Sequence, residues 1–133
     1  MKVTAIIEQN SNGHYSAYIS DERIKFGILG EGKTVEETID DFKIGYEEMK
    51  ETYLSEGKKF NDLEFEFKYD TASFLSVYSN VLSLAGMSRL TGLNQGLLSH
   101  YVTGRKKPTQ KTVSKIRNSV HEFGKTLCQI DFV

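Results

Sequence analysis

The chain lacks several features that mark particular classes of protein. Its 133 residues include no tryptophan, one proline and one cysteine, Cys128. A single cysteine excludes an internal disulfide and a cluster of thiolates around a metal. No apolar run reaches the roughly 18 residues that a membrane span requires, and the first residues lack the basic, apolar and small-residue order of a secretion signal. We therefore expect a cytoplasmic protein without a membrane partner.

Residues that carry catalytic or metal chemistry are also sparse. The three histidines, His14, His100 and His121, lie far apart in the sequence, and none has a carboxylate at the spacing of a metal site. The phosphate-binding loop of nucleotide hydrolases, the GxSxG motif and the HExxH motif are absent. We expect no metal, no cofactor, no catalytic residues and no enzymatic activity.

Charge divides the chain into two halves. Residues 1–69 carry 9 Lys and Arg against 15 Asp and Glu, a net charge of −6, whereas residues 70–133 carry 8 against 3, a net charge of +5. Although a charged helix face is often only solvated surface, opposite charges suit different partners, a cationic one for the first half and a polyanion for the second. We predict one domain in each half, with the boundary between residues 69 and 70.

The basic half contains the spacing of a helix-turn-helix between Ser83 and Pro108. Gly92 separates two short segments, Asn94 can cap the second helix, and Gly104 can end it in a left-handed conformation. The inward faces are Leu84, Met87 and Leu90 in the first segment and Leu97, Leu98 and Tyr101 in the second. This pattern indicates a DNA-binding element, although paired short helices joined at a glycine also occur in domains that do not touch nucleic acid.

The outward positions of the second helix predict how it would contact DNA. The N-terminal turns of a recognition helix meet base edges when the helix enters a major groove. The predicted base-contacting residues are Gln95, Gly96, Ser99 and His100. The residues predicted to contact phosphates supply either a cation or a hydrogen-bond donor. They are Asn94, Thr103, Arg105, Lys106, Lys107 and Lys111.

Two further helices are predicted to flank this pair. Ser73 can cap the earlier one, which would carry Phe74, Leu75, Tyr78 and Leu82. Thr109 can cap the later one, which would bury one stripe made of Val113, Ile116, Val120, Phe123 and Leu127.

Four helices in this order resemble the lambda-repressor-like DNA-binding domain, over residues 72–127. Leu84 stands where many members of that family have a polar residue that contacts phosphate. The residues that carry the resemblance are Gly92-Leu93, Gln95, Leu98-Ser99, Tyr101, Gly104, Pro108 and Thr112.

Strands are predicted in the acidic half. Residues 3–8 and 15–19 would form a hairpin around the turn residues 10–13. A third strand is expected over residues 26–30 and would be ended by Gly30, Gly32 and Lys33. Residues 63–69 alternate between apolar and charged side chains, which is typical of a strand with one buried face.

A helix is predicted between the third and fourth strands. Thr34 and Glu37 have the spacing at which each side chain caps the other's backbone amide. The helix would bury one stripe, made of Val35, Ile39, Phe42, Tyr46, Met49 and Tyr53, and would expose an acidic face.

These elements resemble the HicB antitoxin family, whose N-terminal domain is a partial RNase H-like fold. Its motifs are matched by Ile7-Glu8, by residues 14–18 (HYSAY) and by residues 32–38 (GKTVEET). Residues 20–26 depart from the Pro- and Gly-containing link of many members. The fold class implied is α+β, with a partial RNase H-like β-β-β-α-β domain followed by an all-α helix-turn-helix domain.

The resemblance implies an antitoxin with two partners. Residues 1–69 would bind and neutralise a HicA-type toxin, a small basic protein that cleaves mRNA, and residues 70–133 would bind operator DNA and repress the operon. Helix-turn-helix proteins usually bind as two-fold dimers, so we expect a homodimer or higher homo-oligomer. Its surface would be the last helix with the tail 127–133, unless these pack within the chain. The implied toxin-binding residues are Phe26, Ile28, Glu36, Asp40 and Glu47.

Two other functions are open at this point. A stand-alone repressor would use the first domain to sense a small ligand. An RNase H-like nuclease would hold two divalent ions between carboxylates from several elements. The acidic residues here lie mostly on one helix face or at Glu64 and Glu66 of one strand, which disfavours the nuclease.

Overall fold

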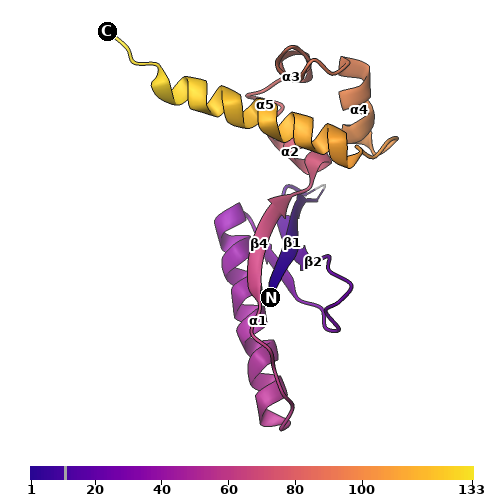
Figure 1. Ribbon diagram of the computed structural model, residues 1–133, viewed down its shortest axis with the longest axis vertical. Coiled ribbons are helices and arrows are strands. Elements are labelled where there is room, and N and C mark those ends of the chain that lie inside the picture. The colour runs from indigo at the N-terminus through magenta and orange to yellow at the C-terminus, as the bar shows by residue number, and fades with distance from the viewer. Residues whose placement is uncertain (11) are drawn as a thin grey trace. The chain divides into compact units, whose positions relative to one another are not determined.

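A four-stranded mixed sheet and five helices make up the part of the chain that the structure, a computed structural model, describes, residues 1–10 and 12–133. The α+β class is therefore confirmed. The chain divides into two units, Met1–Asp70 and Thr71–Val133 (Figure 1). This division lies one residue from the predicted boundary, and the two units are described separately below.

The sheet of unit 1 has the strand order β3-β2-β1-β4. β1 pairs antiparallel with β2, and it pairs parallel with β4, so the last strand of this unit lies beside the first (Figure 1). β3 pairs antiparallel with β2 and forms the other edge. The strands are β1 (Lys2–Gln9), β2 (Tyr15–Ile19), β3 (Leu29–Gly32) and β4 (Glu64–Tyr69). Ser11 of the predicted turn lies outside the described residues.

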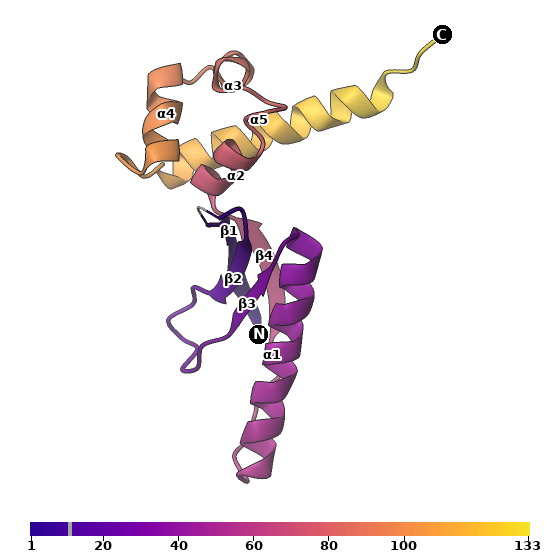
Figure 2. The ribbon, with the colours of Figure 1, turned by 180° about the vertical axis from the view of Figure 1, so that it is seen from behind.

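One face of this sheet packs against helix α1 (Val35–Ser55), as Figure 2 shows from the side of β2 and β3. Val3, Ala5 and Ile7 of β1 point to this face and are buried, as the two-residue period of a strand requires. The Phe42 ring of α1 lies edge-on to the Phe65 ring of β4, with 4.9 Å between centroids. The core of unit 1 is thus built from alternate strand residues and one stripe of α1.

The start of α1 follows the predicted cap in part. Thr34 Oγ1 accepts a hydrogen bond from the backbone N–H of Glu37 at 3.1 Å. Glu37 Oε2 accepts its bond from the N–H of Lys33 at 2.9 Å rather than from that of Thr34. The predicted reciprocal box is therefore shifted by one residue on one side, and both bonds still satisfy donors near the helix start.

The third strand lies later than predicted. β3 covers Leu29–Gly32 instead of residues 26–30, and the glycines expected to end it lie within it. A Cβ at Gly30 would meet the backbone N of Phe42 and the carbonyl O of Thr38 at 2.6 Å. The glycines therefore allow β3 to approach α1 closely, which is a tertiary requirement that turn chemistry does not reveal.

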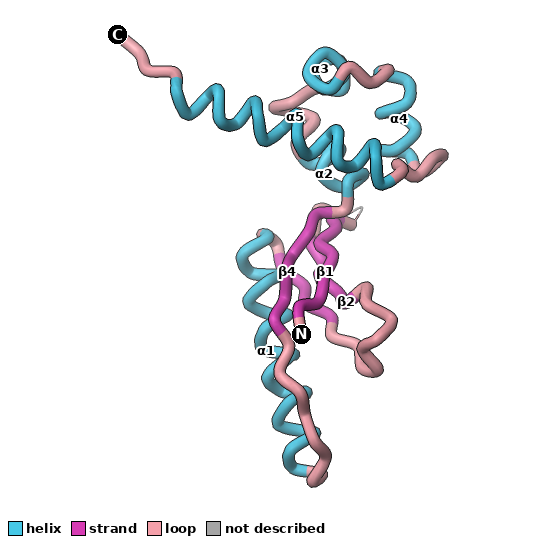
Figure 3. Tube along the Cα trace, in the orientation of Figure 1, coloured by secondary structure: helices cyan, strands magenta, loops and turns pink. Residues whose placement is uncertain are grey.

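Unit 2 consists of four helices joined by short links. Its core consists of Leu75, Met87, Leu98, Tyr101 and Ile116, one or two from each helix. The helices, cyan in Figure 3, are α2 (Thr71–Val77), α3 (Leu84–Thr91), α4 (Gln95–Thr103) and α5 (Gln110–Gln129).

Helix α2 differs from its prediction at both ends. Ser73 lies inside it rather than at its cap, and the helix ends before Tyr78 and Leu82. Ser79 Oγ donates a hydrogen bond to the carbonyl of Ser76 at 2.8 Å, and the N–H of Leu82 bonds back to Tyr78 at 2.7 Å. A serine side chain that bonds to the local backbone competes with the helical pattern, which favours an end at this point.

Candidate nucleic-acid interface

The turn between α3 and α4 is held by hydrogen bonds of three neighbouring residues. Gly92, which was predicted to separate the two helices, ends α3 in the left-handed conformation, with φ of 75°. Thr91 Oγ1 donates to the carbonyl of Met87 at 2.7 Å and accepts from the N–H of Leu93 at 3.1 Å. Because Thr91 is buried, these bonds keep its hydroxyl satisfied and fix where α4 begins.

Asn94 caps the start of α4, as predicted. Its Oδ1 accepts hydrogen bonds from the N–H groups of Gly96 at 2.7 Å and Leu97 at 3.4 Å. A Cβ at residue 96 would lie 3.0 Å from this oxygen, tighter than ordinary contact. Gly96 therefore has a structural reason to lack a side chain. The amide oxygen of Asn94 is used by the cap, and its NH₂ group is a donor of the type predicted to contact phosphate.

The predicted base-contacting residues lie along one side of α4 and differ in exposure. Gln95 and Gly96 of the first turn are exposed, whereas Ser99 and His100 are half-buried. Gln95 is thus the longest freely exposed side chain in the first turn of the helix. An amide at this place can donate and accept together, which is the requirement for pairing with adenine.

The predicted phosphate-contacting residues follow α4 closely. Thr103 Oγ1 donates to the carbonyl of Ser99 at 3.1 Å, so its hydroxyl is used within the helix. Gly104 ends α4 with φ of 79°. Four exposed cations come next, Arg105, Lys106, Lys107 and Lys111, the last of them in the first turns of α5.

One cation that the prediction omitted belongs to the same surface. Lys115 of α5 is exposed, and its Nζ lies 3.9 Å from the place where a Cβ of Gly92 would stand. Helix α5 therefore brings a positive charge to the turn that precedes α4. Sequence spacing could not reveal this neighbour, because it depends on how α5 crosses α3.

Ion pairing leaves this surface positively charged. Among the described residues of unit 2, the one ion pair joins Lys125 and Glu122 at 3.4 Å. The cations around α4 have no carboxylate partner among those residues, so their charge is available to a polyanion. We call Asn94, Gln95, Ser99, His100, Arg105, Lys106, Lys107, Lys111 and Lys115 the α4 surface.

The residues predicted to bind a toxin divide into two groups in unit 1. Glu36, Asp40 and Glu47 are exposed on α1. Ile28 is 6% exposed and belongs to the core, so we remove it from the binding set. Phe26 is half-buried and stacks on Phe60, with 5.7 Å between ring centroids.

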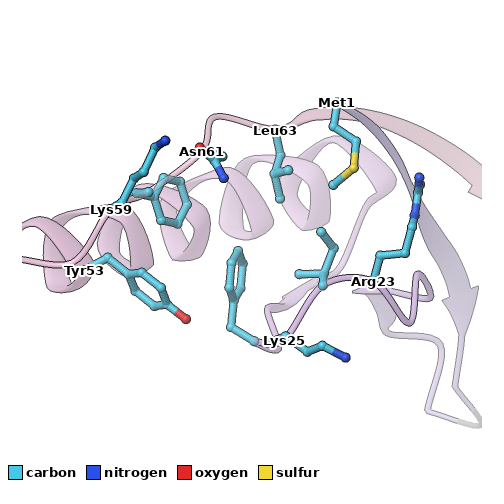
Figure 4. Close-up of a pocket in the computed structure, with 10 residues that line it drawn as sticks. Met1, Arg23, Lys25, Tyr53, Lys59, Asn61 and Leu63 are labelled. Atoms are coloured by element: carbon cyan, nitrogen blue, oxygen red, sulfur yellow. The ribbon is translucent and has the colours of Figure 1, made fainter.

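Phe26 also lines a cavity of unit 1, of about 230 Å³. Figure 4 shows Tyr53 and Lys59 on one side of this hollow and Met1 and Arg23 on the other. Its lining combines apolar and cationic side chains, namely Met1, Arg23, Ile24, Lys25, Phe26, Tyr53, Lys59, Phe60, Asn61 and Leu63. Such a lining suits a small anion with an apolar body.

Arg23 at this cavity pairs with Asp21. The guanidinium donates to both carboxylate oxygens. These hydrogen bonds lower the pKa of Asp21 to about 2. A bidentate pair of this kind occupies the cation, so Lys25 and Lys59 are the more available charges for an anion here.

Comparison with known proteins finds no matching family model, no matching curated protein and no matching solved structure. Residues 1–10 and 12–133 contain no helix with the length and apolar character to cross a membrane. In the same residues, no three His, Cys, Asp or Glu side chains gather as metal ligands would.

Proposed function

We propose that this chain is an antitoxin of the HicB type that acts through both units. Unit 1 binds and neutralises a HicA-type toxin that cleaves mRNA. Unit 2 binds operator DNA as a homodimer and represses the operon. The proposal combines the motif resemblance of the sequence with the geometry of the α4 surface and with the opposite charges of the two units.

The first turn of α4 is the observation that carries the DNA-binding part. Gln95 is exposed there beside a residue without a side chain, and Asn94 holds the helix start. Arg105, Lys106 and Lys107 lie directly after the helix, where phosphates would flank a groove-bound helix, and α5 adds Lys111 and Lys115. Polar groups at the tip and cations beside it are the two components that groove recognition requires.

The dependence of DNA affinity on salt tests this part. Each neutralised phosphate contributes about −0.9 to the slope of log affinity against log salt. Lys106→Ala/Lys107→Ala should therefore reduce the slope by about 1.8 on duplex DNA from the region upstream of the gene. The matched control is Lys58→Ala/Lys59→Ala, an exposed lysine pair in unit 1. Equal slopes for both variants would refute the α4 surface as the DNA interface.

The exposed carboxylates of α1 support the toxin-binding part. Glu36, Asp40 and Glu47 belong to a unit of net charge −6 across residues 1–69. A basic RNA-cleaving partner would be attracted to this face, since charge complementarity raises the association rate and the specificity. The same contact would cover the cations with which such a toxin holds RNA.

Charge reversal in the full chain tests toxin binding. Glu36→Lys/Asp40→Lys/Glu47→Lys should lose the rescue of cells that express the cognate toxin while DNA binding is retained. The control makes the same change in charge elsewhere in unit 1, at the exposed Glu22, Glu64 and Glu66. Loss of rescue in both variants would contradict a specific α1 interface.

A second candidate function is a repressor that senses a ligand through unit 1. The cavity beside Phe26, with Lys25 and Lys59 at its rim, favours this alternative. Its volume of about 230 Å³ is below the roughly 300 to 1,000 Å³ of usual ligand sites, so we rank it second. Release of DNA by small aromatic carboxylates, abolished by Lys25→Ala/Lys59→Ala, would favour it over the antitoxin.

A further inference from the structure

Exposed apolar side chains of unit 2 gather in two segments. Tyr78 and Val81 lie in the link between α2 and α3, and Val81 is 76% exposed. The others lie at the end of α5 and after it, where Phe132 is 87% exposed. These are Leu127, Ile130, Phe132 and Val133. Contiguous exposed apolar surface marks sites of interaction.

The first of these segments borders an apolar groove of about 430 Å³. The groove is bounded by the link before α3, by α3 itself and by α5. It is lined by Val81, Leu82, Ser83, Gly86, Arg89, Leu90 and Phe123. We call it the α3–α5 groove. Its size suits several side chains of an extended segment.

The second segment continues the buried stripe of α5. Ile116 is buried and Val120 packs against the core of unit 2. At the same spacing, Phe123 borders the groove, and Leu127 and Ile130 are then 51% and 52% exposed. The C-terminal half of α5 extends beyond α2, α3 and α4 in both views (Figures 1 and 2). The stripe is therefore covered in its first half and open in its second.

Charge complements this apolar match. Arg89 of the groove is exposed and has no ion pair within residues 1–10 and 12–133. Asp131 stands between Ile130 and Phe132 of the tail, and likewise has no cationic partner there. The molecule thus exposes an apolar segment that contains one acidic residue, Asp131. It also carries an apolar groove that contains one basic residue, Arg89.

We propose that residues 127–133 of one copy occupy the α3–α5 groove of a second copy, and that the second copy returns the same contact. Arg89 would then pair with Asp131 across the interface. Each copy carries both the segment and the groove, which is the self-complementarity of a two-fold interface. The contact involves unit 2 alone, so it rests neither on DNA nor on toxin binding.

Sedimentation equilibrium of the full chain without DNA tests the dimer. The wild type should have twice the 15.1 kDa mass of one chain. Ile130→Ser/Phe132→Ser in the tail and Val81→Glu in the groove should each give monomers with an unchanged circular dichroism spectrum. The control Leu29→Ser/Leu54→Ser removes two exposed leucines of unit 1 and should stay dimeric. A monomeric wild type, or tail variants that remain dimeric, would overturn the proposal.

Charge exchange between copies tests the pairing itself. Arg89→Asp and Asp131→Arg should each weaken self-association by about tenfold. In either variant, residues 89 and 131 carry the same charge, and they face each other at both symmetry-related contacts of the dimer. A mixture of these two variants should associate as heterodimers, since both contacts then join opposite charges. A mixture that stays as weak as its components would show that the groove and the tail do not meet in trans. DNA binding by a monomeric wild type would refute this inference and the homodimer part of the proposed function, but it would leave the proposed DNA-binding and toxin-neutralising roles intact.

Discussion

The phenolic oxygen of Tyr46 accepts a hydrogen bond from the backbone N–H of Leu63 at 2.8 Å. Tyr46 is a buried residue of α1, and Leu63 directly precedes β4. Lys50, one turn further along α1, pairs with Asp62 at 2.7 Å. In Figure 3 the pink segment before β4 runs back alongside α1. These two contacts hold the end of that segment against α1, directly before the chain enters the sheet as β4.

Tyr46→Phe is expected to lower the free energy of unfolding by about 1 to 3 kcal/mol, because a partly buried N–H loses its acceptor. Chemical denaturation measures this change. Tyr53→Phe makes the same chemical change on the same helix, and the described residues show no hydrogen bond from its hydroxyl. A loss as large in Tyr53→Phe would contradict the role given to the Tyr46 hydroxyl.

Gly30→Ala is expected to destabilise unit 1 strongly. The added Cβ would lie 2.6 Å from backbone atoms of Thr38 and Phe42, so β3 or α1 has to move. Overpacking of this kind costs about 1 to 3 kcal/mol or more. Gly27→Ala is the matched control, because nothing lies within 4 Å of a Cβ there. An equal drop in melting temperature for both variants would argue against the close approach at Gly30.

Substitutions at Asn94 can separate its role as a cap from contact with DNA. Asn94→Ala removes the acceptor for Gly96 and Leu97 and should cost about 1 kcal/mol of stability. Asn94→Asp keeps an acceptor at the helix start, where a negative charge is favourable, but it repels phosphates. We therefore expect normal stability and weaker DNA binding for Asn94→Asp. Unchanged affinity at low salt would place Asn94 outside the DNA contact.

Gln95→Ala is expected to lower affinity for the operator by about tenfold while non-specific binding stays nearly constant. A bidentate pair between an amide and adenine is worth about 1 to 3 kcal/mol, whereas non-specific affinity comes from cations. Titrations of operator and random duplexes at matched salt measure the two terms. An equal loss on both duplexes would mean that Gln95 contacts phosphate rather than bases.

The Asp21–Arg23 pair predicts that the stability of the fold depends on pH in the acidic range. The pKa of Asp21 is lowered to about 2 by the hydrogen bonds from Arg23, below the usual value of about 3.9. Because the pKa is lowered in the folded state, the ionised Asp21 stabilises the fold at pH values above its usual pKa. That contribution is lost as the pH falls from about 4 towards 2. Carboxyl carbon NMR should follow this titration. In Arg23→Gln the pKa should return towards the usual value, whereas Lys25→Gln should leave it low.

Several features of the α4 surface could be predicted from single stretches of sequence. Asn94, Gly92 and Gly104 occupy the cap positions that their chemistry favours, and each acts through bonds to residues within four positions. The cations that follow Gly104 are likewise visible as a run. The geometry of these caps depends on local backbone conformation, so the sequence pattern is sufficient to predict them.

Other features required contacts between distant residues. Ile28 looked like a candidate surface residue and is buried, because the chain before β3 folds onto the core. Lys115 joins the α4 surface only through the crossing of α5 over α3. The sequence placed Gly96 among the base-contacting residues, whereas the close neighbour of a Cβ there is the capping oxygen of Asn94.

The sequence by itself determined the order of strands and helices and the division into an acidic and a basic half. It also determined the helix ends at which Thr34, Asn94 and Thr109 cap the starts of α1, α4 and α5 and Gly104 follows the end of α4. These depend on side-chain periodicity and on hydrogen bonds over a few residues. Only the tertiary structure decided that β4 lies parallel to β1, that glycines of β3 touch α1, and that the stripe of α5 is uncovered in its second half. Such outcomes depend on packing between segments far apart in the chain, where shape and close approach select the arrangement.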